Sequence, residues 1–124
     1  QQQRETLAGM RALGALVIAL PGTPVPLFAF AIRFLPPALA QPFLVRAIGR
    51  GRGGKMPSLH IDLHAGNRLS EVVALNGAVA AHGQRLGVPT PVNQWLNDTM
   101  LALARGDISL NTYARKPEKL LTRG

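Results

Sequence analysis

The stretch from Lys55 to Asn93 holds the densest group of chemically capable side chains in this sequence. Between Lys55 and Glu71 the chain places two serines, an aspartate, two histidines, an arginine and a glutamate, and an amphipathic segment follows directly. Such side chains bind substrates, phosphates or metals, and a fold alone does not need so many beside a core-forming segment. We interpret this stretch as one wall of a functional site.

The two histidines, His60 and His64, stand four residues apart, a helical spacing at which two imidazoles can share a metal ion. Asp62 falls on another helix face, no Glu follows His60, and the only candidate for a third ligand is the distant His82. The chain also has no cysteine, which excludes thiolate metal sites, cysteine nucleophiles and disulfides. The pattern favours surface or interface histidines, and we predict no metal.

Ser58 and Asp62 are also four residues apart, so they share one helix face, and Glu71 begins the next helix within reach of Ser58. A serine with carboxylates but no suitable base is a poor nucleophile. The same groups are good hydrogen-bond partners for the hydroxyls of a substrate or a ribose. The alternative is that Ser58, Ser70 and Glu71 only cap helices.

The charge balance favours anionic partners, because 14 basic residues face 6 acidic ones and give a net charge of +8. One local cluster comprises Arg46, Arg50, Arg52 and Lys55, within a glycine-rich run that could cradle phosphate but lacks the P-loop spacing. The few aromatic residues do not interleave with this cluster, so we predict no nucleic-acid partner. A solvated hinge and a small basic binding module remain alternatives.

The apolar pattern predicts one all-α domain over residues 1–124, since no period-two strand pattern occurs. In one helix Val72, Leu75, Val79, His82 and Leu86 recur at helical spacing and predict a buried stripe. The expected helices are Arg4–Leu20, Leu27–Leu35, Ala38–Ile48 with Pro42 inside it, Ser58–Ala65, Ser70 to a left-handed stop at Gly87, and Thr90 to Gly106, followed by a weakly helical basic tail, Asp107–Gly124.

The uncharged run Ala12–Ile32 is interrupted by the prolines between Pro21 and Pro26. Its unbroken part, Ala12–Leu20, has about half of the roughly 20 residues that a membrane span requires, so we predict a buried helix and no membrane partner. The apolar segment Leu27–Val45 offers more hydrophobic surface than so short a chain easily buries. A dimerisation module is therefore a further alternative.

A pattern across Lys55–Asn93 resembles the C-terminal domain of ketopantoate reductases (2-dehydropantoate 2-reductases). The resemblance depends on the order and spacing of several short motifs. They are Lys55-Met56-Pro57-Ser58, Asp62, Gly66, Arg68, Ser70-Glu71-Val72, Leu75-Asn76-Gly77-Ala78-Val79, Gly83, Gly87-Val88-Pro89-Thr90-Pro91 and Asn93.

The resemblance implies a helical bundle like the C-terminal domain of 6-phosphogluconate dehydrogenases, which closes the substrate cleft. It implies that Ser58 binds the substrate and that Glu71 binds substrate or nicotinamide-ribose hydroxyls. Asp62 and Asn76 would support the helices, with Lys55 beside the site. Because Asp62 to Glu71 spans nine residues where the family more often has eight, Glu71 is displaced by about 100° if the helix runs through.

The resemblance also implies a missing partner. An N-terminal Rossmann domain would bind NADPH, and an upstream lysine would be the general acid, so we expect no catalytic residue here. The chain opens at Gln1 without an initiator Met or a signal peptide, and we expect a piece of a longer cytoplasmic protein. The expected reaction is reduction of a small 2-keto acid, in a homodimer, with the isolated chain inactive.

Overall fold

The computed structural model describes residues 1–49, 71–113, 116 and 119. The expected helix Ser58–Ala65 and most of the tail lie outside these residues. Within them the chain is all-α, as predicted, and no strand occurs apart from an isolated bridge between Leu20 and Thr23. The elements are α1 (Gln2–Ala12), α2 (Val25–Phe34), α3 (Pro37–Gly49), a π-helical turn η1 (Val73–Gly77), α5 (Ala78–Leu86), α6 (Pro91–Arg105) and a 3₁₀ turn η2 (Leu110–Thr112).

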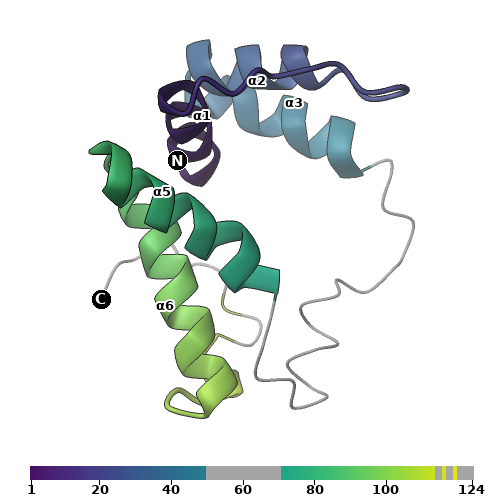
Figure 1. Cartoon of the computed structure of the whole chain (residues 1–124). Coiled ribbons are helices and arrows are strands. Elements are labelled where there is room, and N and C mark those ends of the chain that lie inside the picture. Colours follow the sequence, from purple (N-terminus) through teal and green to yellow (C-terminus); the bar gives the residue numbers. More distant parts are fainter. Residues whose placement is uncertain (50–70, 114–115, 117–118, 120–124) are drawn as a thin grey trace.

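Helix α1 occupies the centre of this arrangement. It contacts α2 on one side and both α5 and α6 on the other, while α3 packs against α2 and α6 packs against η1 and α5 (Figure 1). The N-terminal helix therefore joins a pair formed by α2 and α3 to a pair formed by α5 and α6. Its position decides how the two pairs are held together.

The prediction that the first helix runs from Arg4 to Leu20 is wrong, because α1 ends at Ala12. Gly14 adopts a left-handed φ of 71°. The amide of Gly14 bonds to Arg11 O and that of Ala15 to Met10 O, which closes the helix with a Schellman motif. The apolar residues beyond it are not in a buried helix, and Leu16 is 83% exposed.

The later helix limits follow the sequence closely. Helices α2 and α3 lie within about two residues of the predicted ranges, and α3 continues through Pro42. Gly87 has φ 66° and Gly106 has φ 84°, so both glycines are the predicted left-handed stops. Pro91 occupies the start of α6, where a missing amide hydrogen costs nothing.

The predicted buried stripe is wrong at two positions, since Leu75 is 63% exposed and Leu86 is 37% exposed. The buried face instead carries Val72, Asn76, Ala80 and Gly83. The reason is η1, because a π-helical turn holds one residue more than an α-helical turn and rotates the pattern on either side of it.

The described residues bury few large apolar side chains. The buried apolar residues are Ala31, Ala40, Val72 and Ala80, whereas long apolar side chains on α2 and α3 face outward. No helix in residues 1–49 and 71–113 is both long and apolar enough to cross a bilayer. The exposed apolar side chains of α2 and α3 are Leu27, Phe30, Phe34, Leu39, Phe43 and Val45.

Gly83 permits the close approach of α5 to the turn before α6. A Cβ added there would lie 2.6 Å from Thr90 Cγ2 and 2.7 Å from Val88 O, a backbone atom that cannot move aside easily. We expect Gly83→Ala to lower the free energy of unfolding by about 1–3 kcal/mol. Urea unfolding followed by circular dichroism measures it.

Gly9→Ala is the matched control, because Gly9 is also helical and buried but nothing lies within 4 Å of an added Cβ. It should raise the free energy of unfolding by about 0.5–1 kcal/mol, through helix propensity. If Gly83→Ala stabilises the chain as Gly9→Ala does, the packing of Gly83 against Thr90 is not tight.

Candidate functional site

The residues predicted to form the site fall into two groups. Ser58, Asp62 and Lys55 lie outside the described residues, so their roles stay predictions. Glu71 and Asn76 are described, and both belong to one helical segment that runs from Glu71 through η1 into α5.

Glu71 is the first described residue of this segment and has an exposed side chain, while its neighbour Val72 is buried. The π-helical turn follows two residues later. Since that turn holds one extra residue, it turns Glu71 by about 100° around the helix axis relative to α5, compared with an unbroken α-helix. The direction in which the Glu71 side chain leaves the helix, relative to α5, is therefore set by η1.

Asn76 lies inside η1 and is buried. Its Nδ2 donates a hydrogen bond of 2.9 Å to Oδ1 of Asn93, which is only 1% exposed and sits in the first turn of α6. This bond holds the turn below Glu71 against α6. The expected role of Asn76 in supporting a ligand-binding site stays a prediction. The hydrogen bond to Asn93 is the observed contact through which Asn76 would do so.

Glu5 of α1 completes the buried polar network. Its carboxylate accepts hydrogen bonds from the backbone amides of Val92 and Asn93, at 3.0 and 2.9 Å, and from Asn93 Nδ2 at 2.8 Å. The amides of Val92 and Asn93 belong to the first turn of α6, where helix amides have no partner of their own and the helix dipole is positive. Glu5 therefore caps α6 from another helix.

No local pattern in the sequence indicates this cap. Thr90 was the expected start of α6, yet its side chain makes no capping bond. The acid that replaces it lies 88 positions away from Asn93 in the sequence. Pro91 marks the start of a helix and so indicates that the amides of Val92 and Asn93 need an acceptor. Nothing in the sequence indicates that Glu5 is that acceptor.

Arg4, the residue before Glu5 in α1, caps the C-terminal end of α2. Its charge is opposite to that of Glu5. Arg4 donates from Nε to Ile32 O at 2.8 Å and from Nη2 to Leu35 O at 2.7 Å. These carbonyls lie at the C-terminal end of α2, where the helix dipole is negative. Successive residues of α1 thus hold the end of α2 and the beginning of α6.

Gly77, directly after Asn76, allows η1 to approach α6. A Cβ at this position would lie 2.8 Å from Oδ1 of Asn97, one helical turn beyond Asn93. The Asn76-Gly77 pair therefore combines an amide that bonds to α6 with a residue that leaves room for α6. Oδ1 of Asn97 is buried and has no hydrogen-bond partner among the described residues.

His82 does not complete a metal site within the described residues. Its Nδ1 is buried without a hydrogen-bond partner, and no group of three His, Asp or Glu side chains in residues 1–49 and 71–113 could hold a metal ion. His60 and His64 lie outside these residues. Of the predicted ligand-binding groups, the described residues include the exposed carboxylate of Glu71. The side-chain amides of Asn76 and Asn93, which are hydrogen-bonded to each other, support its helical segment.

Comparison with known protein families identifies the family to which this domain belongs. The family described as "ketopantoate reductase PanE/ApbA C terminal" matches residues 5–104. The chain belongs to this family. The ketopantoate reductase C-terminal domain is helical, and its place in a multidomain family implies an N-terminal partner domain. Searches of curated proteins and of solved structures gave no match.

The family match extends beyond the motifs visible in the sequence. The ketopantoate reductase resemblance rested on Lys55–Asn93, whereas the matched range begins at Glu5 and includes α1, α2 and α3. The Glu5 cap of α6 therefore lies within the family domain, together with Glu71, Asn76 and Asn93.

Removal of the Glu5 carboxylate should destabilise the domain. Glu5→Ala leaves two backbone amides and the Asn93 side chain without their acceptor, so we expect the free energy of unfolding to fall by about 2–4 kcal/mol. Chemical unfolding measures this loss. Gln3→Ala, an exposed change in the same helix, should stay within about 0.5 kcal/mol of the original. Equal effects of the two substitutions would contradict the capping role.

The bond between Asn76 and Asn93 predicts energetic coupling. A double-mutant cycle with Asn76→Ala and Asn93→Ala should give a coupling energy of about 0.5–3 kcal/mol. The matched cycle pairs Asn76→Ala with Asn111→Ala, an exposed change outside this network, and should be additive within about 0.5 kcal/mol. Additivity in the first cycle would show that the bond does not couple η1 to α6.

Proposed function

We propose that this domain forms one wall of the substrate cleft in an NADPH-dependent 2-keto acid reductase that resembles 2-dehydropantoate 2-reductase. The substrate of that reaction is ketopantoate and the product pantoate, on the route to pantothenate. The family match over residues 5–104 carries the proposal. Glu71 also supports the proposal. Its side chain is exposed, and the hydrogen bond between Asn76 and Asn93 anchors its helical segment to α6.

In this proposal Ser58 hydrogen-bonds the polar end of the substrate. Glu71 accepts hydrogen bonds from substrate or nicotinamide-ribose hydroxyls. Asp62, Asn76 and Lys55 support these contacts. NADPH supplies the hydride to the 2-keto carbon, and an N-terminal Rossmann domain holds most of the cofactor. The proton for the carbonyl oxygen comes from a lysine outside this chain.

The proposal includes a cytoplasmic homodimer. Exposed apolar side chains on α2 and α3 support self-association, since large exposed apolar patches mark interaction surfaces. The same surface would suit the N-terminal partner domain. Light scattering on the complete protein distinguishes a monomer from a dimer.

The test of the proposed activity compares the isolated chain with the complete reading frame. NADPH oxidation with ketopantoate should be absent for the 124 residues alone and present for the complete protein. In the complete protein, Ser58→Ala and Glu71→Gln should each lower kcat/KM by about 10–100-fold, the cost of a hydrogen bond to a polar or charged partner. Asp98→Asn is the matched control, because this exposed carboxylate of α6 bonds to its neighbours Gln94 and Asn97.

Turnover by the isolated chain would overturn the proposed division of labour. Unchanged kcat/KM in Glu71→Gln would contradict the proposed role of Glu71 in binding, and the proposed role of Ser58 would still stand. A complete protein that oxidises NADPH with other 2-keto acids but not with ketopantoate would keep the reaction and replace the substrate.

A further inference from the structure

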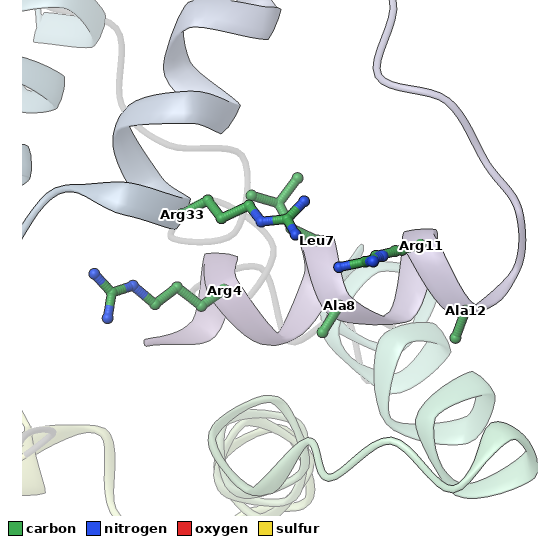
Figure 2. Close-up of a pocket in the computed structure, with 6 residues that line it drawn as sticks. All are labelled: Arg4, Leu7, Ala8, Arg11, Ala12 and Arg33. Carbon is green, nitrogen blue, oxygen red and sulfur yellow. The ribbon is translucent and has the colours of Figure 1, made fainter.

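A cavity of about 500 Å³ opens between α1 and α2. Its lining residues come from these two helices, whereas Glu71 and Asn76 lie on the segment that leads into α5 (Figure 2). A volume of this size is typical of small-molecule sites. The lining residues are Arg4, Leu7, Ala8, Arg11, Ala12 and Arg33.

Half of these residues are arginines, and none is acidic. Arg4 is held in place by its two bonds to the C-terminal end of α2, which leaves part of its guanidinium for another partner. The nearby carboxylate of Glu5 cannot neutralise the cavity, because it is buried and bonded to the first turn of α6. The cavity is therefore strongly positive.

Arg11 and Arg33 are the two guanidiniums available to a ligand. Within the described residues neither makes a hydrogen bond or an ion pair, and Arg33 only lies over the ring of Phe34, 5.1 Å from its centroid. Figure 2 shows the Arg33 side chain reaching from α2 towards Leu7 of α1, with the Arg11 side chain one turn further along α1. Two forked donors on opposite walls can hold the oxygens of one anion.

An apolar groove of about 490 Å³ adjoins this cavity and shares Leu7, Arg11 and Arg33 with it. Apart from the two arginines it is lined by apolar residues, including Met10, Leu16 and Phe30. A ligand whose charged head lies between the arginines would thus find apolar surface beside it. Inorganic phosphate alone would leave the groove empty.

We infer that the space between α1 and α2 binds a small phosphate monoester that carries an apolar group. The phosphate, with a charge of about −1.5 to −2 at neutral pH, matches the guanidiniums of Arg11 and Arg33, and the apolar group lies against Met10, Leu16 and Phe30. A carboxylate of the same length has one charge and would bind less tightly. The inference is independent of the proposed reductase activity, because none of its residues belongs to the proposed substrate wall.

Isothermal titration of the chain with octyl phosphate, octanoate and inorganic phosphate tests the inference. Octyl phosphate should bind at least tenfold more tightly than either of the others. Arg11→Gln and Arg33→Gln should each weaken octyl phosphate binding at least tenfold. Arg85→Gln, at an exposed arginine in the last turn of α5, is the matched control and should leave binding unchanged. Arg4 is kept intact because it caps α2.

Circular dichroism spectra of the variants should match that of the original chain, which separates a lost ligand contact from a lost fold. Phe30→Ala should weaken octyl phosphate binding and leave inorganic phosphate binding unchanged. Equal affinity for octyl phosphate in Arg11→Gln, Arg33→Gln and Arg85→Gln would overturn the inference. Binding to phosphatidic acid vesicles without binding to monomeric octyl phosphate would also overturn it, because the surface would then recognise a membrane.

Discussion

The carboxylate of Glu5 at the first turn of α6 is the interaction on which this domain depends. Burial of a carboxylate is costly unless its oxygens are bonded, and here two backbone amides and one side-chain amide supply the bonds. The described residues bury mainly small apolar side chains, so packing volume contributes little to the choice of helix orientation. The polar network between α1 and α6 therefore determines it.

This network extends to the proposed substrate wall. Asn93 donates hydrogen bonds from its backbone amide and its Nδ2 to the Glu5 carboxylate, and its Oδ1 accepts a hydrogen bond from Nδ2 of Asn76. One buried residue thus connects α1, α6 and η1. The exposed residue Glu71 precedes η1 in the same helical segment. The position of this exposed carboxylate thus depends on the buried carboxylate of Glu5.

Sequence reasoning succeeded at helix limits that a glycine or proline marks clearly, and failed where a regular apolar pattern concealed a local change or where the partner is distant. Gly87, Gly106 and Pro91 mark helix limits because their backbone chemistry acts within one turn. Gly14 was missed because it lies inside an apolar run that reads as a continuous helix. The π-helical turn was not predicted, because an analysis of periodicity assumes the same number of residues in every turn. The Glu5 cap was not predicted, because Asn93 lies 88 positions away in the sequence. The family motifs identified Glu71 and Asn76, but not what holds them.

The adjacent positions of Arg4 and Glu5 constrain α1 in a way that neither could alone. Consecutive residues of a helix point about 100° apart, so the two side chains reach different neighbours. One bonds to the negative end of α2 and the other to the positive end of α6. A rotation of α1 by one residue would break both sets of bonds and could place one of the two charges at a helix end of its own sign. The register of α1 is therefore fixed by charge as well as by shape, and the relative placement of the two helix pairs follows from it.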